Sequence, residues 1–209
     1  MTSDEGGGRR GDSRASPGDS TDHGRADVQG NGARPTASYD GRVSDVCDYC
    51  GCREVPFVGE LMNEHRRLQD EADHIRRAFL AGDRHEVPAR LKDLLSHLAR
   101  HVSREEDGIF TALRTQGEYV DEVDDLEDEH RWLDAAITDL DAGSPALEPA
   151  LSKLFDALEA HIQREDLGIF PVSVVTLGAH GWDLVQRVHD DQPSFLEPEG
   201  DPDRQPVMR

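Results

Sequence analysis

The chain has 209 residues, 35% of them hydrophobic and 32% charged, a length that suits one compact domain with tails. No stretch approaches the roughly 18 uninterrupted apolar residues of a membrane-spanning helix, and Met1 is not followed by a secretory signal, so we expect a cytoplasmic protein. The formal net charge of −21 falls almost entirely on residues 44–209, and this acidity disfavours nucleic acids and anionic membranes, which bind basic surfaces.

Residues 1–43 are expected to form a disordered arm. They contain nine glycines, eight serines or threonines and only eight apolar residues, which follow no period. Such a segment cannot bury enough apolar surface to offset the entropy that it would lose on ordering.

All three cysteines lie within residues 44–54, which we interpret as a turn before the first helix: Cys47, Cys50 and Cys52. Tetrahedral zinc needs four ligands, so an additional metal site here would require a further ligand from elsewhere. Thiols near the start of a helix could instead form a regulatory disulfide, or the turn could have no chemical role. The sequence leaves these three interpretations open.

Residues 55–178 are predicted to form a helical bundle. Apolar residues recur there at alternating steps of three and four, which is typical of amphipathic bundle helices. The four segments run from Leu61 to Phe79, from Leu91 to either Gly108 or Ile109, from Val123 to Leu140, and from Leu147 to either Gly168 or Ile169. Glycines at 82, 117 and 143 separate them. Because short connections make neighbouring helices antiparallel, we predict an all-α, up-down-up-down four-helix bundle. Six aromatic residues are predicted to pack in the core of the bundle and to exclude water from its middle, as a dry wall: Phe57, Phe79, Phe110, Trp132, Phe155 and Phe170.

Residues 179–209 are expected to hold a short capping helix, marked by Trp182, Val185 and Val188, followed by a disordered tail. The tail is placed from Asp190 onward because prolines at 193, 198, 202 and 206 remove backbone donors and favour an extended chain.

The chain also repeats itself. Residues 101–110 align with residues 161–170, sharing His, Arg, Glu, Gly, Ile and Phe, and residues 64–68 align with residues 129–133. Each half is therefore predicted to be a helical hairpin built to one pattern, which gives the bundle a pseudo-twofold axis.

Six ionisable residues occupy seam positions that should face the core: His65, His101, Glu105, His130, His161 and Glu165. A buried unpaired carboxylate costs several kcal/mol, so such residues need a partner. A histidine and a glutamate four residues apart lie on one helix face, and counting from the turns puts all six at one depth to within about a turn. The pattern predicts a buried site for two divalent cations; the alternative is that these charges face solvent.

The order His, His-x-x-x-Glu, His, His-x-x-x-Glu, with Gly-Ile-Phe closing both ligand motifs, resembles the hemerythrin-like (HHE cation-binding) domain family over about residues 55–175. The resemblance implies a non-haem di-iron centre with two bridging glutamates. It assigns the ligands as follows: His65 and His101 to one iron, His130 and His161 to the other, and Glu105 and Glu165 to both.

Oxygen carriers of that family use a fifth histidine one turn away on the third helix. The corresponding positions here are Leu126 and Asp134, so this ligand is missing or replaced by Asp134. His97 stands one turn before His101, but its counterpart in the second repeat is Ala157, and we interpret it as a residue of the helix flank.

The resemblance implies a protein that binds or reacts with dioxygen, peroxide or nitric oxide, as a sensor, scavenger or carrier. Two alternatives are a di-iron peroxidase or oxidase and an iron-responsive bundle that serves metal homeostasis. Mixed imidazole and carboxylate ligands suit iron or manganese, and zinc accepts them as well.

Overall fold

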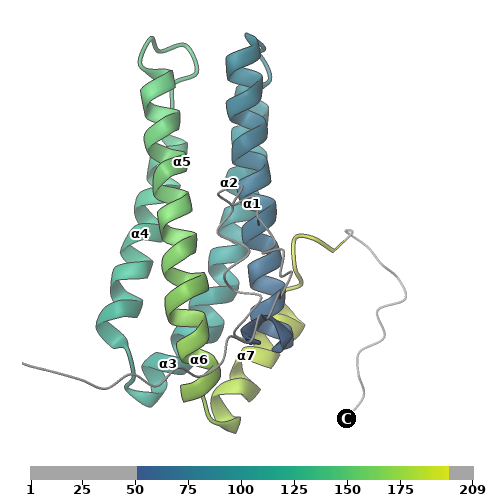
Figure 1. The fold of residues 1–209 in the computed structure, drawn as a ribbon, viewed down its shortest axis with the longest axis vertical. Helices are drawn as coiled ribbons and strands as arrows, with labels where there is room; N and C mark the ends of the chain where they lie inside the picture. The colour runs from purple at the N-terminus through teal and green to yellow at the C-terminus, as the bar shows by residue number, and fades with distance from the viewer. Residues whose placement is uncertain (1–50, 198–209) are drawn as a thin grey trace, which may run out of the picture. The chain divides into compact units, whose positions relative to one another are not determined.

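The computed structural model describes residues 51–197, in which four long antiparallel helices form the bundle (Figure 1). These helices are α1 (Pro56–Ala81), α2 (Val87–Glu105), α4 (Val120–Thr138) and α5 (Leu147–Arg164). Each packs on its neighbour in sequence, and α1 also packs on α5, which closes the ring. No β-strand occurs in residues 51–197. The predicted all-α, up-down-up-down four-helix bundle is confirmed.

Glycines end two of the helices where the sequence predicts breaks. Gly82 follows α1 with a φ of 86°, and Gly117 follows the short helix α3 (Thr111–Gln116) with a φ of 75°. Because residues with a side chain rarely adopt this left-handed conformation, glycine is the usual residue at such a helix end. The chain then reverses and begins the next antiparallel helix.

A short π-helical segment interrupts each of the two ligand-bearing helical runs. The segment η4 (Glu106–Phe110) joins α2 to α3, and η5 (Glu165–Ile169) joins α5 to α6 (Phe170–Thr176). The two segments fall within one residue of the same place in the internal repeat. Single turns of π-helix often occur at functional sites, where they alter the direction of side chains.

The apolar core consists of two clusters along the bundle. One lies toward the α1–α2 turn and contains Leu68, Leu94 and Leu154, and the other contains Leu61 and Leu126. Positions 65, 101, 105, 130, 161 and 165 are buried without belonging to either cluster, and all but position 161 lie between the two clusters in sequence. The bundle therefore encloses a polar layer between two apolar ones.

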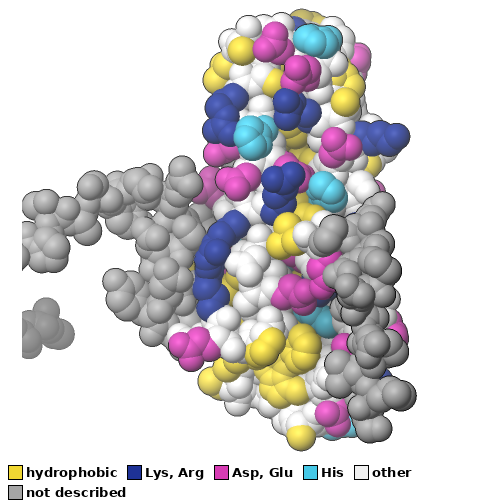
Figure 2. Space-filling model, turned by 90° about the vertical axis from the view of Figure 1, so that its right-hand side faces the viewer, with side chains coloured by type: hydrophobic (Ala, Val, Ile, Leu, Met, Phe, Trp, Pro, Cys, Tyr) yellow, Lys and Arg dark blue, Asp and Glu magenta, His cyan; other side chains and the backbone are white. Residues whose placement is uncertain are grey.

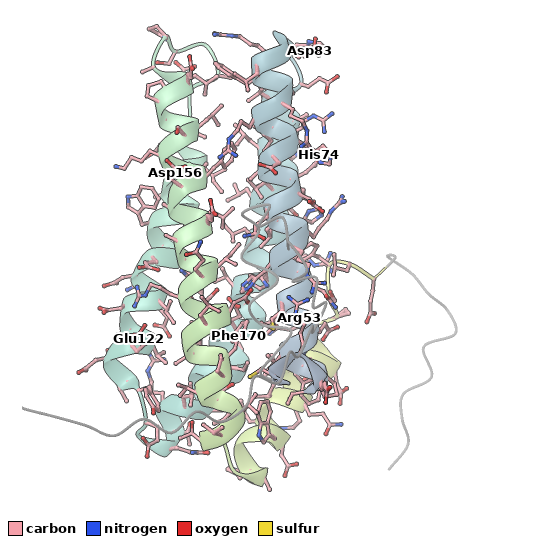
Figure 3. The ribbon with its side chains drawn as sticks, in the orientation of Figure 1. Arg53, His74, Asp83, Glu122, Asp156 and Phe170 are labelled. Atoms are coloured by element: carbon pink, nitrogen blue, oxygen red, sulfur yellow. The ribbon has the colours of Figure 1, made fainter. Side chains whose placement is uncertain are left out.

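Four of the six aromatic residues assigned to the core are buried, Phe57 is partly buried, and Trp132 is exposed. Phe170 and Phe110 are fully buried, whereas exposed residues such as His74 line the outer faces of the helices (Figure 3). The assignment of Trp132 to the core is wrong, because its side chain is 39% exposed and the Lys153 Nζ lies 5.2 Å from its ring centroid. Trp132 follows the seam by two residues and so points away from the bundle axis.

The C-terminal part of the described chain forms a helix that packs across one end of the bundle. Helix α7 (Ala179–Asp191) contacts η4, α3 and α1. Residues 192–197 follow without helix, but Ser194 and Phe195 are buried against the bundle. The helix thus extends beyond the expected start of the tail, and the aromatic ring of Phe195 explains why the chain stays in contact after Pro193.

Cys52 begins the short 3₁₀ helix η3 (Cys52–Glu54) and is buried. The predictions for residues 1–43, Cys47 and Cys50 lie outside the described residues. No helix in residues 51–197 has both the length and the apolar character needed to cross a membrane. Figure 2 shows acidic and basic side chains intermixed on the visible face, with hydrophobic side chains gathered near its lower end.

Candidate metal centre

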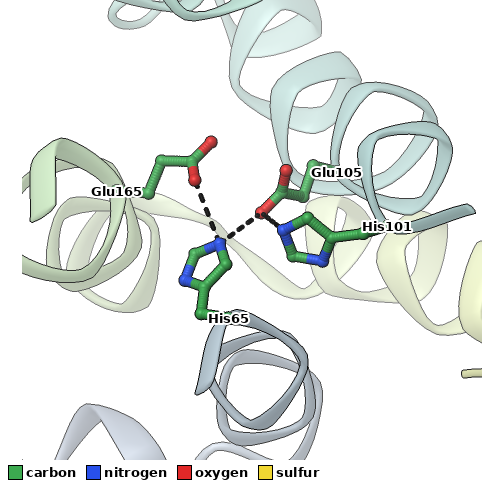
Figure 4. A group of neighbouring side chains, drawn as sticks. All are labelled: His65, His101, Glu105 and Glu165. Carbon is green, nitrogen blue, oxygen red and sulfur yellow. Dashed lines mark ion pairs between the residues drawn. The ribbon is translucent and has the colours of Figure 1, made fainter. Parts of the chain in front are cut away.

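Six ionisable side chains from all four long helices and η5 meet in one buried layer. Each of the six is at most 3% exposed. They are His65 of α1, His101 and Glu105 of α2, His130 of α4, His161 of α5 and Glu165 of η5. Figure 4 shows four of them converging from three elements: His65 from α1, His101 and Glu105 from α2, and Glu165 from η5. The structure therefore brings together all six residues that the seam pattern singled out.

Glu105 faces histidines from both halves of the bundle. Its Oε1 atom lies 3.0 Å from His101 Nε2 and 3.4 Å from His65 Nε2. Its Oε2 atom lies 3.4 Å from His130 Nε2. The two oxygens of one carboxylate are thus directed at two different histidine groups.

Glu165 has the reciprocal arrangement. Its Oε1 atom lies 3.2 Å from His161 Nε2 and 3.4 Å from His130 Nε2, and its Oε2 atom lies 3.1 Å from His65 Nε2. Two groups of possible ligands result, each with its atoms within 4.8 Å of one another, and Glu165 belongs to both. The first group is His65, His101, Glu105 and Glu165, and the second is His130, His161 and Glu165.

The atoms that face the middle of this layer have no hydrogen-bond partner. They are the Nε2 atoms of the four histidines and both Oε atoms of Glu105 and Glu165. Buried polar atoms are normally hydrogen-bonded, so eight such atoms that face only one another at one place are suited to a shared partner such as a metal ion. Two ligands about 2.1 Å from one cation and at right angles lie about 3.0 Å apart, close to the observed separations. The residues fit a pair of metal ions.

An outer ring of carboxylates orients the histidines. Each Nδ1 atom lies 2.8 or 2.9 Å from a carboxylate oxygen. The pairs are His65 with Asp166, His101 with Glu64, His130 with Glu106 and His161 with Glu129. Because an ionised carboxylate only accepts hydrogen bonds, Nδ1 carries the hydrogen and donates it. A neutral ring then presents the lone pair of Nε2 to the centre, as a metal ligand does.

In the absence of metal, the carboxylates of the layer favour the protonated form of the histidines beside them. Burial acts to lower the pKa of His130, but the carboxylates around it, Glu105 first among them, outweigh burial and raise this pKa to about 12. Burial likewise opposes protonation of His65, whose pKa is nonetheless raised well above the ordinary value, chiefly by Asp166. Burial acts to raise the pKa of Glu165, but the surrounding histidines hold it well below its usual range. A cation that binds here must displace these protons.

Arginines hold the outer carboxylates in both halves, but in different surroundings. Arg104 forms an ion pair with Glu64, and Arg164 forms one with Glu129. The Arg104 side chain is 1% exposed, whereas that of Arg164 is 34% exposed. His189 of α7 adds to the first half, with its Nδ1 atom 2.7 Å from Arg104 Nη2. The arginine–glutamate contact therefore occurs in both halves of the pseudo-twofold repeat, but it is buried in only one of them.

Two phenylalanine rings cover histidines of the layer, one in each half of the site. The ring of Phe170 stacks on His65 at a centroid distance of 5.5 Å, and the ring of Phe110 stacks on His130 at 5.8 Å. Both phenylalanines come from the Gly-Ile-Phe ends of the repeated motifs. They exclude water from one face of a histidine in each half, as the sequence analysis expected of a dry wall.

Three residues one turn away from predicted ligands, Asp134, Leu126 and His97, lie outside both groups of possible ligands. Asp134 is exposed on α4, and Leu126 is fully buried in an apolar cluster. His97 is 28% exposed at its side chain, and its Nδ1 atom lies 2.8 Å from Glu71. The interpretation of His97 as a residue of the helix flank agrees with this position.

Several residues of the centre were missed by the sequence analysis. The outer carboxylates Glu64, Glu129, Glu106 and Asp166 were not singled out, although each pair occupies equivalent positions of the repeat next to a predicted ligand. His189 was also missed. Its spacing from Trp182 and Val185 follows the same steps of three and four as the seams, so the helical pattern could have indicated its burial.

The fold and the site together define the class of protein: an all-α bundle with a buried histidine and glutamate cluster that could hold metal ions. The family model of the hemerythrin HHE cation binding domain matches residues 57–173, more than half of the chain. The chain belongs to this family, as the sequence motifs predicted. A search of the curated proteins and a search of the solved structures give no match.

Proposed function

We propose that this protein binds two non-haem iron ions and uses them to bind or react with a small molecule of the class of dioxygen, peroxide or nitric oxide. The ligands would be divided between the ions as follows: His65 and His101 on one, His130 and His161 on the other, and Glu105 and Glu165 shared. The observation that carries the proposal is the set of eight buried, unpartnered nitrogen and oxygen atoms that converge between two apolar clusters.

The donor set supports a redox metal. Imidazole and carboxylate ligands suit iron and manganese, and a bound iron pair would supply the capacity to exchange electrons with a small oxidant. The chain contributes the surroundings of that chemistry. The outer carboxylates fix the ring orientation, and Phe110 and Phe170 keep water from one side of the histidines.

The test of this function begins with elemental analysis of protein purified without added metal. We expect close to two iron ions per chain. The ferrous protein, prepared without air, is then mixed with dioxygen, with hydrogen peroxide and with nitric oxide in separate experiments. A spectral change reversed by deoxygenation indicates a carrier, and catalytic loss of peroxide indicates an enzyme. Absence of iron, or iron that reacts with none of the three, would contradict the proposal.

Metal binding is expected to release protons at neutral pH. Without metal, the pKa values of His130 and His65 are raised far above the ordinary value despite burial, because carboxylates surround them, so these two rings hold protons at pH 7. Raising the pH lowers the concentration of protons that compete with the metal and should strengthen metal binding. Calorimetric titration with Mn²⁺ in buffers of different ionisation enthalpy measures the release. An affinity that stays constant between about pH 6 and about pH 8 would contradict this expectation.

A further inference from the structure

The two halves of the candidate centre differ in how well they are shielded from solvent. In the half of His65 and His101, the outer carboxylates Glu64 and Asp166 have side chains that are 0% and 10% exposed. In the half of His130 and His161, the equivalent side chains are far more open: Glu129 is 37% exposed and Glu106 is 36% exposed. The contacts repeat in both halves, but only one half is sealed.

The C-terminal segment covers the Glu64 side of the shielded half. Helix α7 places His189 against Arg104, and Ser194 donates a hydrogen bond from its Oγ atom to Glu64. Both contacts reach the half of His65 and His101. The internal repeat supplies two hairpins, whereas the C-terminal segment follows only the second and covers one side of the bundle. Solvent therefore reaches the half of His130 and His161 more readily.

A surface pocket of about 380 Å³ lies on the open half, between α2 and α4. His130 is one of its lining residues, and so is Glu106, which accepts the hydrogen bond from His130 Nδ1. The walls next to them include the apolar side chains of Leu98, Ala99 and Val102. The pocket thus leads from solvent to a histidine whose other nitrogen faces the centre.

The charge of the pocket selects against anions. Its polar lining residues are Ser103, Glu106, Asp107, Arg131 and Asp134. The lining therefore carries three carboxylates and one guanidinium, that of Arg131. This guanidinium already forms an ion pair with Asp128 on the same helix. A negative field at a pocket mouth lowers the local concentration of anions and leaves uncharged molecules unaffected.

We infer that this pocket is the route and the binding site for an uncharged small molecule, and that the molecule reaches the centre from the side of His130 and His161. The inference rests on the proposed function, since it concerns access to the metal pair. It specifies the half of the centre that the molecule reaches and the residues that line its route. It also specifies the class of molecule that is admitted: uncharged species such as nitric oxide, dioxygen or un-ionised hydrogen peroxide.

The test fills the pocket and uses the internal repeat as its control. Ser103→Trp places a large side chain in the pocket, and Gln163→Trp makes the same change at the equivalent position of the other half. Both positions are partly exposed. Stopped-flow mixing of the iron-loaded ferrous protein with nitric oxide gives the association rate constant. We expect Ser103→Trp to lower it about tenfold or more and Gln163→Trp to leave it within about twofold of the unchanged chain.

A second pocket variant keeps the test decisive if Ser103→Trp does not fold. Ala99→Phe narrows the same pocket from an exposed position, and helical circular dichroism and iron content are measured for every variant. Unaltered association in both Ser103→Trp and Ala99→Phe, with normal iron content, would overturn the access route alone. An unchanged chain that takes up no iron or binds no nitric oxide would instead overturn the proposed function, and with it the inference.

The charge selection has its own measurement. Asp134→Lys reverses one charge at the pocket mouth, at a residue that lies outside both groups of possible ligands. At low ionic strength we expect azide, an anion, to associate several-fold faster with this variant, while nitric oxide associates at the same rate. Equal azide rates in the two proteins at low salt would contradict the assignment of selectivity to the pocket.

Discussion

Replacement of Glu165 by alanine is expected to reduce the iron content of the purified protein well below two ions per chain. Glu165 is the residue that belongs to both groups of possible ligands, with one oxygen toward His65 and the other toward His130 and His161. Loss of even an outer-shell partner typically costs about 10- to 100-fold in metal affinity, so loss of a shared ligand should cost more. Elemental analysis and Mn²⁺ titration measure the effect.

His97→Ala is the matched control for this loss. His97 lies one turn before His101 on α2, and its Nδ1 atom also meets a carboxylate, that of Glu71. It nevertheless lies outside both groups of possible ligands. We expect His97→Ala to keep the iron content of the unchanged chain. Equal iron in Glu165→Ala and the unchanged chain would discard the ligand assignment, and equal loss in both variants would show that the effect is not specific to the site.

The helical bundle was predictable because its pattern is repeated along the whole sequence. Steps of three and four place Leu61, Leu68 and Ile75 on one face of α1, and all three are fully buried. The same steps left open whether position 108 or 109 continues the second seam. In the structure both are buried, because η4 is a π-helical turn that accommodates an additional residue. Local irregularity of this kind has no separate mark in a hydrophobic pattern.

The six central residues were also predictable, since ionisable side chains at core positions contradict the pattern around them. The asymmetry of the centre was not. It depends on where the C-terminal segment packs, and the sequence of α7 specifies an apolar face without specifying its partner. His189 and Ser194 reach Arg104 and Glu64 from 85 and 130 residues away in the sequence. Contacts over such separations follow from tertiary packing alone.

Replacement of Arg104 by methionine is expected to destabilise the metal-free protein by about 3–5 kcal/mol, the usual cost of removing one partner of a buried ion pair. Arg104 is 1% exposed and pairs with Glu64, whose side chain is fully buried. Methionine fills part of the space but leaves the Glu64 carboxylate without its cation. The contact with His189 is lost as well, so the hold of α7 on the bundle should weaken.

Arg164→Met provides the comparison, because Arg164 makes the equivalent contact with Glu129 at 34% exposure. Water can solvate the carboxylate that this change leaves behind, and pairs of this kind contribute about 0–1 kcal/mol. Urea unfolding of the two variants without metal, followed by circular dichroism, gives both free energies. A similar loss in the two variants would mean that the C-terminal segment does not seal the half of His65 and His101. A decrease in the free energy of unfolding that occurs only in Arg104→Met would show that the buried ion pair on the side covered by the C-terminal segment stabilises the bundle.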